Sequence, residues 1–224
     1  MSPRVLLGML TPSSNTVLEP VTTAMLAGLP EASAHFGRFR VTEIALSPQA
    51  LGQFDDSEIL RAAELLSHAK VQVIAWNGTS SGWLGFEADE RLCARIEAAT
   101  GVRRIGLVTP YIDEVQAKII ANYARHGVEC AGERHLRLQD NYSFSEVGDD
   151  RLRSMIRDVA QAKPDAITVF CTNLRGAPLA AEPEAELGIP IYDTISTVVW
   201  KSLRLAGIDT RRVRGWGRLF QDVL

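Results

Sequence analysis

The chain of 224 residues is predicted to adopt an α/β fold with two similar halves, each built around a mostly parallel sheet. Short β-branched runs alternate with amphipathic helical patterns, which is typical of parallel strands joined by helical crossovers. Apolar runs such as Val71–Trp76 and Ala166–Phe170 indicate central strands that are buried on both faces of a sheet. Two pairs of similar segments also repeat between the halves of the chain.

The individual elements follow from these patterns in chain order. The β-branched runs predict strands over Arg4–Leu10, Arg40–Leu46, Val71–Trp76, Arg104–Val108, Glu129–Leu136, Ala166–Phe170 and Pro190–Tyr192. The spacing of apolar residues between them predicts helices over Ser57–Ala69, Glu87–Ala99, Ile112–His126, Asp150–Ala162 and Thr197–Ala206.

The internal repeat predicts where ligands bind. Arg4–Pro12 is similar to Arg103–Pro110, and Val73–Ser80 is similar to Ala166–Asn173, so each half has one strand ending in Thr-Pro and another ending in a small polar loop. Because ligands of open α/β sheets bind at the carboxyl ends of strands, we expect the active site in the cleft between the halves.

The repeat also predicts the extent of the two halves, residues 1–102 and 103–224. The second half continues after its polar loop through a helix, a strand near Gly188–Asp193 and a further helix. The first half runs from Val102 directly into the next half, so we expect a strand–helix unit to be missing there, either through a true deletion or because a segment is absent from this sequence.

Composition excludes several classes of partner. A net charge of -3 gives no electrostatic reason to expect nucleic acid or an anionic membrane as a partner. No apolar stretch approaches the roughly 20 residues that span a bilayer, and the apolar run at the N-terminus is too short for a signal peptide. We therefore expect a cytoplasmic protein.

Nothing in the sequence predicts a cofactor or a metal. The chain has no GxGxxG motif, no P-loop, no GxSxG elbow and no cluster with metal-ligand spacing. Three cysteines without a CxxC pair argue against a disulfide framework and a structural zinc site. We expect neither a cofactor nor a metal.

The histidines are poorly placed for catalysis. None of them falls in the loop after a predicted strand: His68 and His126 end helices, where a cation is favoured, and the others are His35 and His135. A catalytic histidine is therefore not expected.

Cys171 differs from the other cysteines. Cys93 on a predicted helix and Cys130 at a strand start are typical of small buried apolar residues. Cys171 directly follows a predicted strand, where loop amides could lower its pKa or hold an oxyanion. The alternative is a buried cysteine at a strand end.

Further candidates lie in the other strand-end loops. Gly78 holds the position that corresponds to Cys171, and Thr79 and Ser80 follow it with hydroxyls that suit a carboxylate or enediolate, unless this loop is a plain polar turn. Tyr111 follows the second Thr-Pro and is expected to face the cleft. Asn15 and Asp113 are also good helix N-caps.

Taken together, these motifs resemble the aspartate/glutamate racemase superfamily, and most closely its maleate cis-trans isomerase and arylmalonate decarboxylase branch. The matching stretches cover most of the chain: Thr11–Asn15, Asn77–Ser80, Thr109–Asp113, Cys171–Leu174, Leu203–Gly207 and Gly215–Phe220. The resemblance implies two pseudo-symmetric flavodoxin-like halves, a small dicarboxylate substrate and no cofactor, and it allows a homo-oligomer.

Within this branch the signals conflict. Gly78 with a single Cys171 resembles the decarboxylase, which has glycine where the isomerase and the racemases have a first cysteine. Asn15 and Asp140–Asn141 instead resemble the isomerase, whose asparagines hold substrate carboxylates. The decarboxylase has an apolar pocket at that place.

We expect a cofactor-independent decarboxylase of a 2-substituted malonate-like dicarboxylate, acting through an enediolate that Cys171 protonates. The expected catalytic residues are Cys171, Tyr111, Thr79 and Ser80, and the expected substrate-binding residues are Asn15, Gly78, Thr172, Asn141 and Pro12. The alternatives are a maleate isomerase, an aspartate/glutamate-type racemase, and a non-catalytic member of the family that binds a carboxylate.

Overall fold

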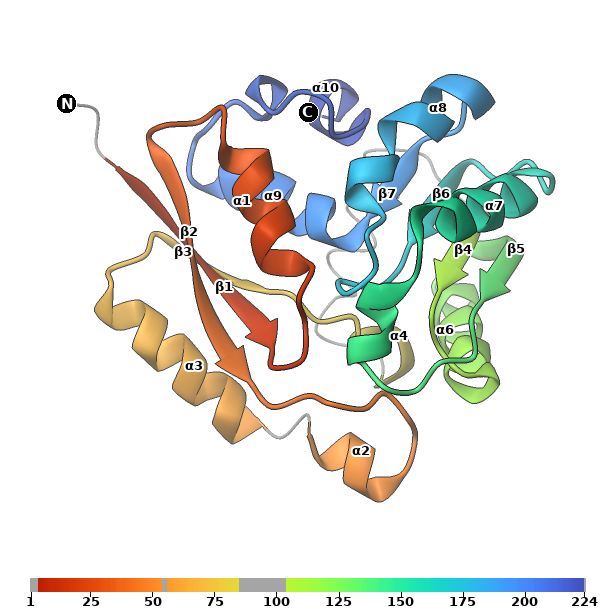
Figure 1. Ribbon diagram of the computed structural model, residues 1–224, viewed down its shortest axis with the longest axis horizontal. Coiled ribbons are helices and arrows are strands. Elements are labelled where there is room, and N and C mark those ends of the chain that lie inside the picture. Colours follow the sequence, from red (N-terminus) through yellow and green to blue (C-terminus); the bar gives the residue numbers. More distant parts are fainter. Residues whose placement is uncertain (1–3, 54–55, 85–103, 224) are drawn as a thin grey trace.

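The computed structural model describes residues 4–53, 56–84 and 104–223. Two separate parallel sheets form its framework (Figure 1). The first has the strand order β2-β1-β3, and the second has the order β5-β4-β6-β7. The bounds are β1 Val5–Pro12, β2 Ala32–Phe39, β3 Val73–Trp76, β4 Arg104–Thr109, β5 Glu129–His135, β6 Ala166–Val169 and β7 Ile191–Asp193. The α/β fold with parallel sheets is thus confirmed.

Helices cover the faces of both sheets. Their bounds are α1 Leu18–Leu26, α2 Pro48–Gly52, α3 Asp56–His68, α4 Ser81–Leu84, α6 Asp113–Arg125, α7 Asp149–Ala160, α8 Ala181–Leu187, α9 Thr194–Leu205 and α10 Leu219–Asp222. Short 3-10 turns lie at Tyr142–Glu146, Ala177–Leu179 and Thr210–Arg212. None of the helices in the described ranges is long and apolar enough to cross a membrane.

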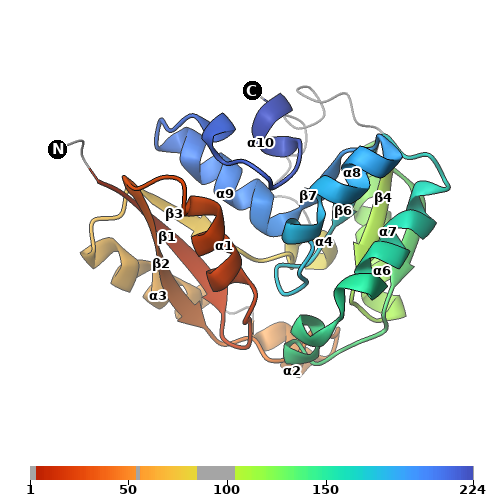
Figure 2. The same cartoon turned by 45° about the horizontal axis from the view of Figure 1, so that its top comes forward.

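Helix α9 joins the two halves. Its buried residues Ile195, Val199 and Leu203 recur every four positions and therefore form one stripe, which packs in a core shared with β1 and α1 of the first half. Figure 2 shows α9 reaching from β7 towards the first sheet. The helix begins at Thr194 rather than at the predicted Thr197, because the Asp193 side chain caps the amides of Ile195 and Ser196.

The predicted strand Arg40–Leu46 is wrong. The second strand lies earlier in the chain, at Ala32–Phe39, and pairs with β1 from Val5 to Pro12. Val41 and Ile44 are buried, but they pack towards the second half, and the only ladder contact of their segment is an isolated bridge between Glu43 and Asp140. The alternation of apolar residues in Arg40–Leu46 therefore reflects burial against the second half, not pairing within a sheet.

The two sheets differ in size among the described residues. β7 extends the second sheet beside β6, and no described strand lies beside β3 in the corresponding place of the first sheet. The missing strand–helix unit expected from the sequence would lie at this place. That gap, the boundary after Val102, the predicted helix Glu87–Ala99 and Cys93 all fall outside the described residues.

Candidate active site

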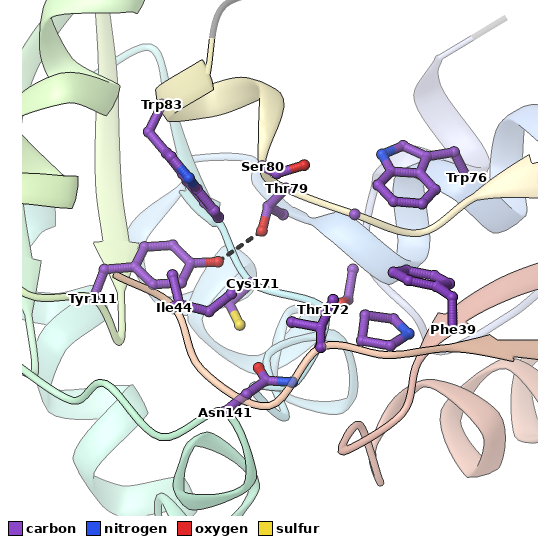
Figure 3. A pocket seen from close by; sticks show the side chains of 13 residues that line it. Phe39, Ile44, Trp76, Thr79, Ser80, Trp83, Tyr111, Asn141, Cys171 and Thr172 are labelled. Atoms are coloured by element: carbon purple, nitrogen blue, oxygen red, sulfur yellow. Dashed lines mark hydrogen bonds between the residues drawn. The ribbon is translucent and has the colours of Figure 1, made fainter. Parts of the chain in front are cut away.

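The carboxyl ends of strands from both halves meet around one small cavity (Figure 3). Its volume is about 20 Å³, which is room for about one water molecule. The residues that line it are Pro12, Phe39, Val41, Ile44, Trp76, Gly78, Thr79, Ser80, Trp83, Tyr111, Asn141, Cys171 and Thr172. All of the sequence-predicted site residues except Asn15 are therefore brought together. A larger ligand requires some of the lining side chains to move.

Cys171 follows β6 by one intervening residue, and only 3% of its surface is exposed. The backbone N–H of Asn173 lies 3.4 Å from its Sγ. Burial raises the pKa of the Cys171 thiol to about 12, and this effect outweighs the opposing ones of the Asn173 amide and the Tyr111 hydroxyl. The loop amide of Asn173 does act to lower this pKa, but burial has the larger effect and the net shift is upward. At neutral pH Cys171 is a protonated thiol, suited to donate a proton.

Tyr111 presents a hydroxyl to the same cavity. Its ring is fully buried and packs edge-on against Trp83 and Phe144, with centroid distances of 5.1 Å and 5.7 Å. The hydroxyl forms a hydrogen bond of 2.7 Å with the Thr79 hydroxyl of the first half. Burial raises the pKa of Tyr111 well above its usual value. Tyr111 is thus a neutral phenol that can donate a hydrogen bond at the cavity.

The backbone of the Tyr111 loop is held by the chain that follows β5. The N–H of Arg137 donates to the Tyr111 carbonyl at 3.1 Å, and the N–H of Leu138 donates to the Pro110 carbonyl at 2.8 Å. Arg137 also donates from its side chain to Asp113 at 2.8 Å, and its own backbone has a positive φ of 58°. These contacts hold the loop at both of its ends.

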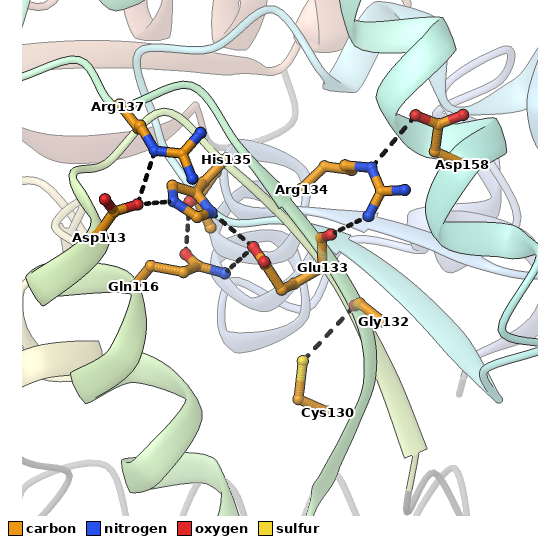
Figure 4. A network of polar contacts seen from close by, with 10 residues as sticks. Asp113, Gln116, Cys130, Gly132, Glu133, Arg134, His135, Arg137 and Asp158 are labelled. Atoms are coloured by element: carbon orange, nitrogen blue, oxygen red, sulfur yellow. Dashed lines mark hydrogen bonds and ion pairs between the residues drawn. The ribbon is translucent and has the colours of Figure 1, made fainter.

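A polar network below this loop contains His135, the last residue of β5 (Figure 4). Its two ring nitrogens lie 2.5 Å from Asp113 and 2.7 Å from Glu133. Gln116 continues the network from Glu133 to the buried Thr109. His135 is therefore at the carboxyl edge of the sheet, but it ties α6 to β5 and does not line the cavity.

The loop after β3 brings Gly78, Thr79 and Ser80 to the cavity. The Thr79 hydroxyl is directed towards Tyr111, whereas the Ser80 hydroxyl points away from that ring (Figure 3). Gly78 lies beside the Trp76 indole: a Cβ placed on Gly78 would be 2.3 Å from Trp76 Cζ2. The Trp76 ring in turn stacks on Phe39 with centroids 5.0 Å apart.

Asn15 lies behind the cavity wall and is completely buried. Its Oδ1 accepts from the backbone N–H groups of Val17 and Leu18, and its Nδ2 donates to the carbonyl and the hydroxyl of Thr172. These four hydrogen bonds use the capacity of the side-chain amide. Asn15 thus fastens the start of α1 to the residue after Cys171, and it reaches the site through Thr172.

Asn141 of the second half does line the cavity, and it also contacts the first half. Its Nδ2 donates to the Ser14 hydroxyl at 2.7 Å. Asn173, which the sequence did not single out, donates to the Asn141 carbonyl at 2.6 Å and accepts from the N–H of Thr16. Asn173 lies two residues after Cys171, so these two hydrogen bonds connect the loop that carries the thiol to Asn141 and to Thr16.

The sequence analysis missed the apolar part of the wall. Phe39, Val41, Ile44, Trp76 and Trp83 line the cavity, and none of the lining residues carries a charge. Of these residues, only Trp76 could have been identified from its position in the sequence, because it ends β3 directly before the polar loop. In the described ranges, no three His, Cys, Asp or Glu side chains are grouped so that they could hold a metal ion.

Comparisons with known proteins find a matching family model and relatives of two kinds. A sequence model of the arylmalonate decarboxylase family matches residues 98–220. An arylmalonate decarboxylase from Bordetella bronchiseptica is 31% identical over 126 residues, which are 55% of this chain and 52% of that protein. This match thus spans about half the length of the decarboxylase.

Isomerases match over more of the chain. A maleate isomerase from Geobacillus stearothermophilus is 23% identical over 233 residues, covering 91% of this chain and 92% of the isomerase. Among solved structures, a Nocardia farcinica maleate cis-trans isomerase mutant with a covalently bound succinylcysteine intermediate has a TM-score of 0.83. It is 23% identical, and the match covers 98% of this chain and 99% of that one. This similarity shows a shared two-domain fold.

Proposed function

The chain belongs to the arylmalonate decarboxylase family, and on that premise we propose that it is a cofactor-independent decarboxylase of a 2-substituted malonate-like dicarboxylate. The observation that carries this proposal is the single protonated thiol of Cys171, which shares a cavity with a glycine at the corresponding position of the other half. One thiol, with no second thiol opposite it among the described lining residues, suits a reaction that ends with protonation from one face.

The reaction begins with cleavage of a C–C bond. One carboxylate leaves as CO2, and the electron pair of the broken bond stays on the substrate as an enediolate. The hydroxyl of Tyr111, supported by Thr79, lies in position to donate to the developing oxyanion. Preorganised donors of this kind stabilise charge as it forms and need no reorganisation.

Protonation completes the reaction. The Cys171 S–H gives its proton to the α-carbon, and the resulting thiolate recovers a proton from water. A thiol whose pKa is raised to about 12 stays protonated at neutral pH and becomes a strong base once it has given up its proton. The enzyme therefore returns to its starting state without any added reactant.

The wall of the cavity favours the departure of CO2. Val41, Ile44 and Trp83 offer no charge to the carboxylate that leaves. A carboxylate next to apolar side chains loses hydration, whereas neutral CO2 does not need it. The remaining carboxylate has the hydrogen-bonding groups of Tyr111 and Thr79 available on the other side.

An isomerase of a small dicarboxylate is the second candidate. Asn141 at the cavity and the isomerase relatives that align over more than nine-tenths of the chain favour it. A mechanism through a cysteine adduct needs a thiolate that adds to the alkene. Gly78 offers no thiol, and the raised pKa of Cys171 opposes ionisation of the other one. These two residues favour the decarboxylase.

Proton NMR in D2O tests the proposal with phenylmalonate, methylphenylmalonate and maleate as substrates. We expect decarboxylation with deuterium at the α-carbon, no turnover by Cys171→Ala, and full turnover by the control Cys130→Ala. Formation of fumarate from maleate would establish the isomerase instead. No reaction with any of the three, by a protein that still binds a carboxylate, would favour a non-catalytic member of the family.

A further inference from the structure

We propose that Trp76 is the residue that confines this site to chemistry from one face, because its indole ring occupies the space that any side chain at position 78 would need. The inference goes beyond the proposed function in naming a specificity-determining residue, and its consequence for catalysis rests on that function. Trp76 ends β3 and is followed after one residue by Gly78, so both belong to the same wall of the cavity.

The steric evidence is direct. A Cβ on Gly78 would lie 2.3 Å from Cζ2, 2.4 Å from Cε2 and 2.7 Å from Nε1 of Trp76. All three distances are far inside the contact distance of carbon atoms, which is about 3.5–4.0 Å. All three atoms belong to the rigid indole ring of Trp76. The overlap can therefore be relieved only if the whole ring moves, not by a small rotation at the tip of a flexible side chain.

The indole is held in this position by a second aromatic ring. Phe39, at the end of β2, is 2% exposed and stacks on Trp76 with an interplanar angle of 26°. Offset-stacked aromatic rings contribute to stability beyond the area that they bury. A side chain at position 78 therefore has to displace Trp76 from this stack.

This arrangement has a consequence for catalysis. Position 78 corresponds to Cys171 in the internal repeat, so it is where the first half would place a second acid–base group. With Trp76 in place the first half presents an aromatic surface to the cavity instead. An aryl substituent on the α-carbon suits this surface, because flat rings pack on one another in offset stacks.

Thermal unfolding tests the steric relationship independently of any activity. We expect Gly78→Ala to lower the Tm of the wild-type protein by about 4–8 °C, as overpacked sites do. In a Trp76→Ala background, and equally in a Trp76→Leu background, the same change should cost little or nothing. Gly52→Ala is the matched control, because a Cβ there meets no atom within 4 Å. An equal loss of Tm in all three backgrounds would overturn the proposal.

Racemisation tests the consequence for catalysis. The substrate is enantiopure 2-phenylpropionate in D2O, and the variants are Gly78→Cys and the double variant Trp76→Ala/Gly78→Cys. In the double variant the introduced thiolate removes the α-proton, the electron pair moves into the enediolate, and Cys171 S–H protonates the opposite face. We expect the double variant to racemise the acid at least about tenfold faster than Gly78→Cys alone, a difference of about 1.4 kcal/mol in the barrier.

The two arms separate the possible failures. Equal racemisation by Gly78→Cys with and without Trp76 would contradict the inference. A wild-type protein that decarboxylates no arylmalonate would refute the proposed function. The unfolding experiment would then still decide whether Trp76 excludes a side chain at position 78.

Discussion

The hydroxyl oxygens of Thr79 and Tyr111 lie 2.7 Å apart and so connect the loop after β3 with the loop after β4 at the edge of the cavity. One residue comes from each half of the chain. The hydrogen bond therefore depends on how the two halves are assembled, and it places the phenol beside the Cys171 thiol.

Tyr111→Phe tests the role of this hydroxyl. The variant keeps the ring contacts with Trp83 and Phe144, so we expect the protein to stay folded. Removal of one oxyanion donor should lower kcat/KM for an arylmalonate by about 10²–10³-fold. Steady-state kinetics beside a thermal unfolding curve measures both effects. An unchanged kcat/KM would show that the phenol is only a packing residue.

The pKa of Cys171 predicts how the thiol reacts with iodoacetamide. With a pKa of about 12, only about one thiol in ten thousand is ionised at pH 8. The alkylation rate should therefore rise by about tenfold per pH unit through pH 10, without levelling off near pH 9. Peptide-resolved mass spectrometry follows the residue, and the unfolded chain provides the control. A plateau between pH 8 and 9 in the folded protein would contradict the assigned protonation state.

Asp193 predicts a dependence of stability on pH. Burial raises its pKa to about 7, despite the N–H groups of Ile195 and Ser196 that donate to it. An unfolded aspartate ionises near pH 3.9, so between about pH 4 and pH 7 only the unfolded chain loses this proton. The stability that the neutral carboxyl provides is present below this window and is lost as the pH rises through it.

Asp193→Asn removes this ionisation and keeps an oxygen for the cap. We expect the Tm of the variant, measured relative to wild type, to increase from pH 5 to about pH 7 and then to level off towards pH 8. Asp209→Asn is the matched control, because Asp209 also caps the N–H of a following residue but is exposed and has a lowered pKa. Its Tm difference should stay constant over the same range. A constant difference for Asp193→Asn as well would refute the prediction.

Asn15→Ala tests whether Asn15 acts on the structure or on the substrate. The change removes the cap of α1 and leaves Thr172 without two buried hydrogen bonds. We expect a loss of about 2–4 kcal/mol in the free energy of unfolding in urea. Asn15→Asp keeps the cap oxygens but not the donors to Thr172, so it provides a comparison. A rise in KM with unchanged stability would instead make Asn15 a substrate-binding residue.

Local patterns in the sequence were sufficient for much of the fold. Strands β4 and β6 begin at the predicted residues Arg104 and Ala166, because long β-branched runs between helical patterns leave few alternatives. The same reasoning failed at Arg40–Leu46. The apolar side chains there are buried by the other half of the molecule, and a sequence pattern cannot tell this burial from burial within a sheet.

The candidate site could be located because its polar residues directly follow strands. This rule found Cys171, Tyr111 and the Gly78 loop, since the carboxyl ends of parallel strands meet at one edge. It did not find Phe39 or Ile44, whose side chains resemble those of any core residue. It also could not show that the amide of Asn15 is already fully used in hydrogen bonds within the protein.

The sequence by itself thus determined the α/β class, the repeated halves and the strand-end residues, because each depends on residues close together in the chain. Only the tertiary structure decided that Cys171 is protonated and that Trp76 covers Gly78. Both properties depend on which distant side chains surround a group. Burial sets the cost of a charge on the thiol, and the stack with Phe39 keeps the indole against the glycine.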